Sequence, residues 1–214
     1  MRTRKNWRRR YSDSSTEEAI LPRNEIILAS ASPRRRELLS LIFGEFRIVP
    51  SGFDERLVPR ELGPPEHVTH SALMKARDIA AQHPEALVIG ADTVVVVDST
   101  ILGKPQDAAD AARMLRMLGG RTHQVYTGVA VARGQSEASG FECTDVSVRE
   151  LDDAIIARYV ATGEPMDKAG AYAIQGRGSV LITGINGCYF NVVGLPIYRL
   201  SRMLEEFGIH PLEG

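Results

Sequence analysis

The sequence predicts an α/β protein in which a twisted mixed β-sheet is flanked by helices. Residues 26–29 form a short apolar run that passes through a polar turn into a helix. Residues 87–97 form a longer run, apolar on both faces, which is typical of a central strand. Residues 64–82 carry an apolar stripe at helical spacing. Strands and helices in this order indicate a sheet with helices packed against it.

The composition favours one globular domain. The chain has 214 residues, of which 43% are hydrophobic, and this is enough for a substantial core. Its formal net charge of -1 provides no global basic field of the kind that nucleic-acid binders use. No apolar run reaches the roughly 18 residues of a membrane span, and no secretory signal is recognisable. We therefore expect a cytoplasmic protein with no nucleic-acid or membrane partner.

The two cysteines indicate neither a disulfide scaffold nor a zinc site. Cys143 and Cys188 are far apart in the sequence and show no CxxC spacing. We expect both to be reduced thiols, as is usual in a cytosolic protein.

Residues 1–24 differ in composition from the remainder. They are polar and Arg-rich and show no helical or strand periodicity, which predicts a disordered basic extension before a domain over residues 25–209. An organellar presequence is the alternative, because Arg and Ser suit one, but Asp13, Glu17 and Glu18 do not.

The turn after the first strand carries an unusual charge. Ser32 is placed to cap the helix, and Pro33 occupies its first position. Arg34, Arg35 and Arg36 follow, although a helix N-terminus favours carboxylates. A phosphate bound by backbone N–H groups, serine hydroxyls and guanidinium groups would explain this charge. Arginines that project into solvent or pair with distant carboxylates are the alternative.

The next segments bring further charged residues near strand ends. Residues 46–50 predict a second strand, and Asp54 and Glu55 follow it in a loop, where α/β proteins often bind ligands. A solvated turn is the alternative. Lys75 lies beside the apolar stripe of the predicted helix, where a lysine is usually a snorkelling flank residue rather than a phosphate ligand.

Asp92 interrupts the strongest strand signal in the chain. A carboxylate within a central strand must be paired, hydrated or bound to a metal ion, because an isolated buried charge is too costly. Gly90 and Ala91 leave space for a ligand or another backbone to approach. Asp92 is therefore either a functional carboxylate or the structural partner of a buried cation.

The remaining elements are predicted from turn and cap residues. Residues 101–105 form a hairpin return that includes Lys104, and Asp107 caps a helix over residues 108–118. Two strands near residues 124–132 and 141–149 are joined by a loop around residues 134–139. Asp152 or Asp153 caps a helix ending at Gly163, and the last helix contains the apolar residues Ile197 to Phe207. Residues 167–178, with Lys168, Tyr172 and Gln175, suggest a backbone-lined pocket, or else a surface loop.

Several motifs together resemble the Maf family of nucleoside triphosphate pyrophosphatases. The matching pieces are SASPRRREL at residues 30–38, GADTVV at 90–95, LGKP at 102–105, GRTHQVYTGVA at 120–130, YVATGEPMDKAGAYAIQG at 159–176 and NVVGLP at 191–196. The resemblance covers residues 26–207. It implies two lobes around a central nucleotide-binding groove, as in inosine triphosphate pyrophosphatase, and a homodimer is a further expectation.

The resemblance also implies an activity and its residues. Water would attack the α-phosphorus of a nucleoside triphosphate, giving the monophosphate and pyrophosphate with the help of Mg²⁺ or Mn²⁺. Asp92 would be the catalytic carboxylate and, with Glu55, a metal ligand. The residues that would bind substrate phosphates or the base are Ser30, Arg34, Arg35, Lys75, Thr93, Lys104, Lys168 and Gln175. Arg34, Thr93 and Gln175 match the family branch that hydrolyses dTTP and UTP.

The chain departs from the family pattern in one helix. The usual RLAxEKA is replaced by HSALMKA at residues 70–76, so that His70 and Met74 stand where Arg and Glu are expected, and Lys75 is the one charged residue of the pattern that is retained. This departure affects the surroundings of Lys75. Three alternatives to dTTP and UTP hydrolysis remain: a pyrophosphatase for methylated GTP or other modified nucleotides, a nucleotide-binding regulator of cell division, and a nucleic-acid-binding module, which the even charge balance disfavours.

Overall fold

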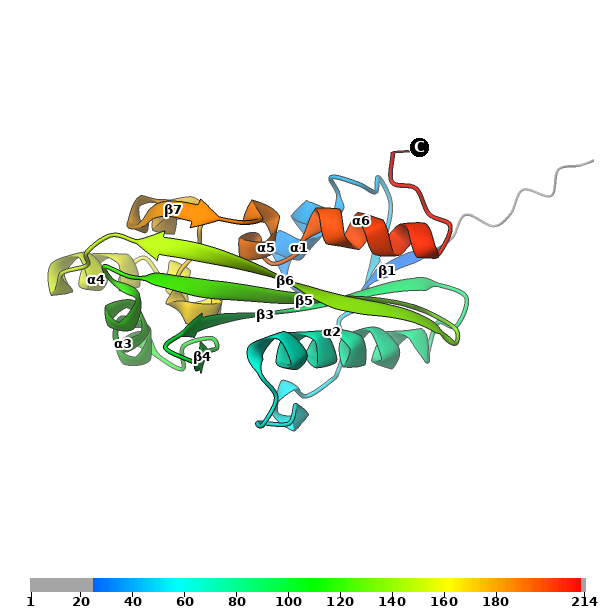
Figure 1. Ribbon diagram of the computed structural model, residues 1–214, viewed down its shortest axis with the longest axis horizontal. Coiled ribbons are helices and arrows are strands. Elements are labelled where there is room, and N and C mark those ends of the chain that lie inside the picture. The colour runs from blue at the N-terminus through cyan, green and yellow to red at the C-terminus, as the bar shows by residue number, and fades with distance from the viewer. Residues whose placement is uncertain (1–24, 213–214) are drawn as a thin grey trace, which may run out of the picture.

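A seven-stranded mixed β-sheet forms the centre of the molecule (Figure 1), as the computed structural model describes it for residues 25–212. The strand order is β2-β1-β3-β5-β6-β7, and β4 pairs with β3 outside this path. β1 is parallel to β2 and β3, and the other pairs are antiparallel. The strands are β1 Ile26–Leu28, β2 Arg47–Ile48, β3 Leu87–Val97, β4 Thr100–Leu102, β5 Thr122–Arg133, β6 Ser136–Val148 and β7 Ile182–Asn186.

Helices flank both faces of this sheet, as the sequence predicts. In Figure 1, α2 covers one face, α1, α5 and α6 lie over the other, and α3 and α4 gather at one end. The helices are α1 Pro33–Leu39, α2 Pro64–Ala80, α3 Ala108–Leu118, α4 Asp153–Val160, α5 Tyr189–Val193 and α6 Ile197–Glu206. Short 3-10 helices are η1 Glu55–Leu57, η2 Glu164–Asp167, η3 Ala169–Ala171 and η4 Gly176–Leu181.

The capping residues of α1, α3 and α4 explain where these helices begin. Ser32 caps α1 by accepting from the backbone N–H of Arg35, and Pro33 is its first residue. Asp107 and Asp152 cap α3 and α4 through their carboxylates. The Ncap oxygen satisfies a backbone donor that has no partner within the helix, so these caps fix the starts of the helices.

Two glycines allow α2 to lie very close to the sheet. A Cβ atom on Gly90 of β3 would lie 2.2 Å from the carbonyl oxygen of Ala72, and one on Gly128 of β5 would lie 2.1 Å from that of Val68. No side chain fits at these distances, so the expected close approach at Gly90 is confirmed, and the approaching backbone is that of α2. Lys75 is thereby placed directly over β3.

One edge of β3 is left partly unpaired. β5 pairs with β3 from Val88 to Val96 on one edge, so β1 and β4 share the other edge. β1 pairs with residues 87–89 and β4 with residues 95–97, which leaves the middle of β3 without a strand partner on that side. Asp92 and Thr93 lie in this gap, and their side chains point to opposite faces because side chains alternate along a strand.

The apolar core is divided at the same place. On the face of β3 that carries the odd-numbered residues, Leu87, Ile89 and Ala91 belong to a cluster with α1 and α6. Val95 and Val97 belong to a second cluster with α3 and α4. Thr93 stands between them, so the polar centre of β3 lies between two separate apolar clusters.

Three differences from the sequence-based expectations concern the strands and their connections. The loop expected around residues 134–139 is a turn at Gly134 and Gln135, because Arg133 already pairs with Ser136 and Gly134 adopts a positive φ of 56°. β7 was not predicted, because Ile182–Asn186 is short and mostly exposed and has no alternating pattern. The second strand is only Arg47–Ile48.

The structure describes the two cysteines but not the N-terminal extension. Cys143 and Cys188 are free thiols, as expected. The predicted basic extension over residues 1–24 lies outside the described residues. In residues 25–212, no helix is both long enough and apolar enough to cross a membrane.

Candidate functional site

A cavity of about 660 Å³ opens beside the unpaired middle of β3. Its walls come from the β1–α1 turn, the loop before η1, α2, β3, the segment around η3, and the end of α5. All ten residues proposed from the sequence line it, namely Ser30, Arg34, Arg35, Glu55, Lys75, Asp92, Thr93, Lys104, Lys168 and Gln175. Residues spread over most of the domain sequence therefore meet in one place.

Asp92, Lys75 and Glu55 form a cluster on the α2 side of this cavity. The Lys75 Nζ atom lies 2.7 Å from Asp92 Oδ1 and 2.6 Å from Glu55 Oε1. The side chains of Lys75 and Asp92 are only 10% and 9% exposed, whereas that of Glu55 is 59% exposed. A lysine ammonium is thus held between a buried carboxylate and one that reaches solvent.

Lys75 is therefore not the snorkelling flank residue that its place beside the stripe suggested. α2 packs on Gly90, and the neighbouring Ala72 and Ala76 are fully buried, so the lysine points toward the sheet. A buried ammonium requires a partner, since an uncompensated charge in the interior is very costly. Asp92 supplies that partner, and the ion pair satisfies both groups.

Glu55 is positioned by the short helix that it begins. Asp54 caps η1 by accepting from the backbone N–H of Arg56, and its carboxylate also accepts from the Arg56 guanidinium. These hydrogen bonds lower the pKa of Asp54 to about 2. Asp54 is thus occupied in the turn, and Glu55 is the carboxylate of this loop that reaches Lys75.

Arg35 lies on the opposite side of β3 and is held by three acceptors. Its Nε donates to the Gly194 carbonyl at 2.9 Å, Nη1 to Ser30 Oγ at 3.2 Å and Nη2 to Thr93 Oγ1 at 3.0 Å. Burial lowers the pKa of this guanidinium. Each terminal nitrogen retains a second N–H group, so the fixed fork still has donors for an anion.

A chain of hydrogen bonds behind Arg35 determines that the Thr93 hydroxyl donates to Thr127. Thr127 donates to the Asn191 carbonyl at 2.9 Å, so its oxygen is free to accept from Thr93 at 3.0 Å. The Thr93 proton is then used, and its oxygen accepts from Arg35. Thr93 therefore helps to hold the Arg35 guanidinium in place. Ser30 accepts hydrogen bonds from Arg35 and from the Ser32 N–H, so its own hydroxyl proton is free to bind a ligand.

The three arginines at the start of α1 have different environments. Arg34 forms an ion pair with Asp167 at 3.2 Å, and Asp167 also contacts Lys168. Arg35 is turned back onto β3, and Arg36 is exposed. The alternative interpretation of the arginine run is confirmed in part, because Arg34 pairs with a distant carboxylate and Arg36 is exposed. Arg34 and Arg35 line the cavity, and a phosphate bound there stays a prediction.

The cavity is strongly cationic. Its lining contains six lysine and arginine side chains, Arg34, Arg35, Arg56, Lys75, Lys104 and Lys168, against three carboxylates, Glu55, Asp92 and Asp167. Within residues 25–212, Lys104 forms no ion pair with a carboxylate. This excess of positive charge suits a polyanion such as a triphosphate.

Sequence reasoning did not assign roles to Asp167, Thr127 or Asn191. All three lie within motifs that carried the family resemblance, which was the available signal, and two of them, Thr127 and Asn191, belong to the hydrogen-bond chain behind Arg35. Their roles depend on the β3–β5 register, which places Thr127 opposite Thr93, and on the packing of α5. Neither can be read from the sequence alone.

The carboxylates of the site fit a metal ion that prefers oxygen ligands. In residues 25–212, no group of three or more His, Cys, Asp and Glu side chains is placed to hold a metal ion. Asp92 and Glu55 contact the same lysine nitrogen, so they are the two carboxylates that could share a cation. Mg²⁺ is usually held by one or two carboxylates together with substrate phosphates, and this pair matches that pattern.

Comparisons with known proteins show the family to which this chain belongs. The chain is 53% identical over 188 residues to a dTTP/UTP pyrophosphatase of Moorella thermoacetica, covering 87% of this chain and 96% of that protein. Proteins with the same description from Pelotomaculum thermopropionicum and Bacillus pumilus are 53% and 49% identical, each over 88% of this chain and 99% of the relative. The family model described as Maf-like protein matches residues 25–207. The chain therefore belongs to the Maf family.

Proposed function

We propose that this protein hydrolyses dTTP and UTP to the nucleoside monophosphate and pyrophosphate. The observation that carries the proposal is the cluster of Asp92, Lys75 and Glu55 on the wall of a cavity whose other walls are cationic. The names of the relatives, which describe dTTP/UTP pyrophosphatases, support the same activity.

In the proposed reaction, water attacks the α-phosphorus and Asp92 takes its proton. The new bond joins the water oxygen to the α-phosphorus, and the bond from that phosphorus to the oxygen of the β-phosphate breaks. Pyrophosphate leaves with the electron pair of this bond. Positioned carboxylates commonly serve as general bases of this kind, contributing about 100-fold to 10,000-fold in rate.

The cationic residues would bind the triphosphate and stabilise the charge that develops on the leaving group. Arg35 presents a fixed guanidinium and Ser30 a free hydroxyl proton on one side of β3. Arg34, Lys104 and Lys168 line the same cavity and would neutralise the outer phosphates. Preorganised donors of this kind stabilise a transition state without rearranging during the reaction.

Asp92 and Glu55 would hold a divalent cation, Mg²⁺ or Mn²⁺, when the nucleotide is bound. The cation would supply Lewis-acid polarisation of phosphate oxygens. Because the Lys75 ammonium already contacts both carboxylates in the absence of ligand, we expect weak metal binding until phosphate oxygens complete the ligand set. Treatment with a chelator should abolish turnover, and added Mg²⁺ or Mn²⁺ should restore it.

Gln175 would recognise the pyrimidine base. It lines the cavity, and within residues 25–212 its side chain has no hydrogen-bond partner, so both its amide oxygen and its amide nitrogen are free to pair with a base edge. Thr93 would contribute indirectly, by orienting Arg35.

The same proposal extends to the organisation of the protein. The cavity would be the nucleotide groove between two lobes, each built around one of the apolar clusters that flank Thr93. Residues 25–209 would form the catalytic domain, and the two free thiols are consistent with a cytoplasmic location. A homodimer stays a prediction, which sedimentation of the purified protein would test.

A panel assay tests the proposed activity. The purified protein is incubated with Mg²⁺ and with dTTP, UTP, CTP, GTP and methylated GTP separately, and products are resolved by chromatography. The proposal expects the highest kcat/KM for dTTP and UTP, with monophosphate and pyrophosphate as products. A preference for methylated GTP would favour the modified-nucleotide alternative, and nucleotide binding without turnover would favour a regulatory role.

A further inference from the structure

We propose that Glu164 and Tyr159 are positioning residues for base recognition, because together they fix residues 173–178, the loop that carries Gln175. This inference rests on the proposed function for its choice of substrate. Neither side chain is part of the cavity lining, so any effect of the pair on a bound nucleotide would pass through the loop.

Glu164 binds one end of this loop. Its Oε2 accepts from the Arg177 N–H at 2.9 Å and its Oε1 from the Gly178 N–H at 2.8 Å. Hydrogen bonds from these amides and from Tyr159 hold the pKa of Glu164 below its usual range despite partial burial. The group is therefore an ionised carboxylate, and charge-assisted hydrogen bonds of this kind are stronger than neutral ones.

Tyr159 binds the other end. Its hydroxyl donates to Glu164 Oε1 at 2.9 Å and accepts from the Ala173 N–H at 3.1 Å. Its ring is 5% exposed and belongs to the apolar cluster around α3 and α4. Burial raises the pKa of this tyrosine, so the hydroxyl keeps the proton that it donates. Tyr159 thus links the loop to the apolar cluster around α3 and α4.

The loop is fitted closely around these two side chains. Gly176 has a positive φ of 71°, and a Cβ atom there would lie 2.6 Å from Glu164 Oε2. A Cβ on Gly178 would lie 2.3 Å from the Ala173 carbonyl oxygen and 2.5 Å from the Tyr159 hydroxyl. Glycines at these two positions therefore allow the backbone to approach the carboxylate and the phenol closely.

Gln175 lies between the two fixed points. Ala173 is held by Tyr159, and Arg177 by Glu164, so only a few bonds separate Gln175 from an anchored amide on each side. Glu164 also begins η2, whose last residue, Asp167, pairs with Arg34. η2 thereby connects the loop that carries Gln175 to Arg34 in the cavity.

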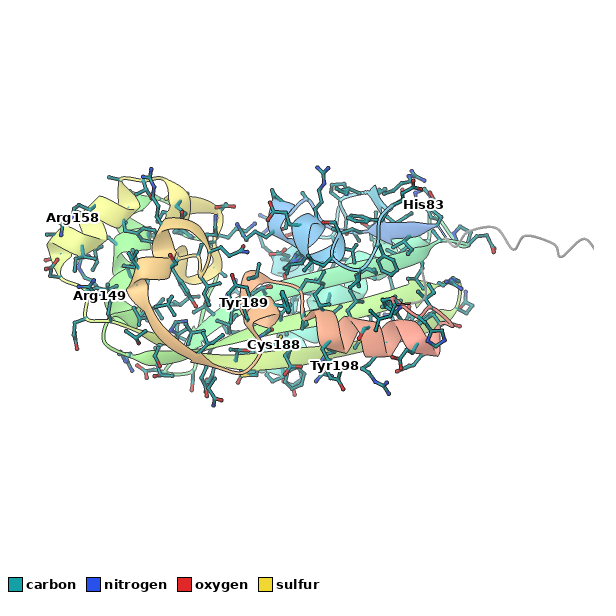
Figure 2. All side chains as sticks on the ribbon, turned by 90° about the horizontal axis from the view of Figure 1, so that it is seen from above. His83, Arg149, Arg158, Cys188, Tyr189 and Tyr198 are labelled. Atoms are coloured by element: carbon teal, nitrogen blue, oxygen red, sulfur yellow. The ribbon has the colours of Figure 1, made fainter. Side chains whose placement is uncertain are left out.

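Tyr159→Phe is the variant that tests the inference, because the ring is kept and only the hydroxyl is lost. The Ala173 amide then has no partner, and Glu164 loses one donor. Glu164→Gln replaces one carboxylate oxygen with an NH2 group, which cannot accept from the backbone N–H that faces it. This variant should therefore also weaken the attachment of the loop. Tyr198→Phe is the matched control, since Tyr198 is 75% exposed on α6; Figure 2 shows it on a different part of the molecule from Arg158, the residue before Tyr159.

Each variant is assayed with dTTP and with a ribose triphosphate that lacks a base. For Tyr159→Phe and Glu164→Gln we expect kcat/KM for dTTP to fall by about tenfold, mainly through KM, as for the loss of one hydrogen bond. The base-free substrate should change less than about twofold by the same reasoning, because it makes no contact with Gln175. Tyr198→Phe should match the wild type with both substrates.

Hydrogen exchange of residues 173–178 provides a second measurement that does not depend on turnover. Faster exchange in this loop, with unchanged exchange in α2, is expected for Tyr159→Phe. Equal losses with both substrates, or no loss with either, would overturn the inference. A wild-type protein inactive on dTTP and UTP would instead overturn the proposed function, and the variants would then be compared on the triphosphate that it does hydrolyse.

Discussion

Asp92 has two roles in this site, because it faces the cavity and also pairs with the buried Lys75. The 2.7 Å contact with Lys75 makes it the structural partner of a buried cation, one of the two roles that its place in an apolar strand allowed. The pairing does not compete with the catalytic role. Asp92 lines the cavity, where a positioned carboxylate can accept a proton from water as a general base.

Asp92→Asn should therefore affect both activity and stability. The variant cannot accept the proton, so we expect kcat to fall by about 100-fold or more. Lys75 keeps only the more exposed Glu55, and the free energy of unfolding should fall by about 3 kcal/mol, at the lower end of the range for breaking a buried pair. Steady-state kinetics and urea unfolding measure the two effects.

Asp98→Asn is the control for this substitution. Asp98 follows the same strand, but its ion pair with Arg121 is exposed, so neither kcat nor stability should change appreciably. Near-normal turnover by Asp92→Asn would remove Asp92 from the proposed mechanism and leave Glu55 as the next carboxylate to examine.

At the scale of elements, the contact between α2 and β3 determines whether Lys75 and Asp92 meet. Gly90→Ala would place a Cβ atom 2.2 Å from the Ala72 carbonyl, so the helix must move away from the sheet. We expect a loss of about 1–3 kcal/mol in stability, as for other overpacked positions. A fall in kcat should accompany it, because the displaced helix carries Lys75.

Gly44→Ala gives the matched comparison for the helix contact. A Cβ atom at Gly44 would have nothing within 4 Å, so this variant should resemble the wild type in melting temperature and kcat. If Gly90→Ala lost stability but kept full kcat, the position of α2 would not control the chemistry.

The elements also show which features could be predicted from the sequence. Caps and apolar periodicity predicted α1, α2, α3 and β3, because these signals are local. β7 was missed because its exposed residues carry no pattern, and its place is set by pairing with β6. The motifs predicted ten residues that line the cavity. The ion pair between Lys75 and Asp92 could not be predicted, because it depends on the packing of α2 against β3.

At the scale of the whole molecule, one buried histidine makes stability depend on pH. His123 is 2% exposed, and burial lowers its pKa from 6.5 to about 4. The unfolded chain binds this proton below pH 6.5, whereas the folded chain does not until about pH 4. Stability from this group is therefore fully present above pH 6.5 and is lost progressively as the pH falls toward 4.

Comparison with His123→Gln isolates this contribution. Between pH 7 and pH 4.5, the wild type should lose about 2.5 kcal/mol more of its unfolding free energy than the variant. Other titrating groups are common to both proteins and cancel. Urea unfolding at the two pH values measures the difference, and equal losses in the two proteins would show that His123 is not held neutral in the folded state.

The central claim, that water attacks the α-phosphorus of a pyrimidine nucleoside triphosphate, is tested most directly with isotopic oxygen. dTTP is hydrolysed by the wild-type protein in water enriched in ¹⁸O, and the products are analysed by mass spectrometry. Attack at the α-phosphorus predicts one ¹⁸O atom in the thymidine monophosphate and none in the pyrophosphate. Label found in the pyrophosphate would mean attack at the β-phosphorus, and would contradict the mechanism proposed for Asp92.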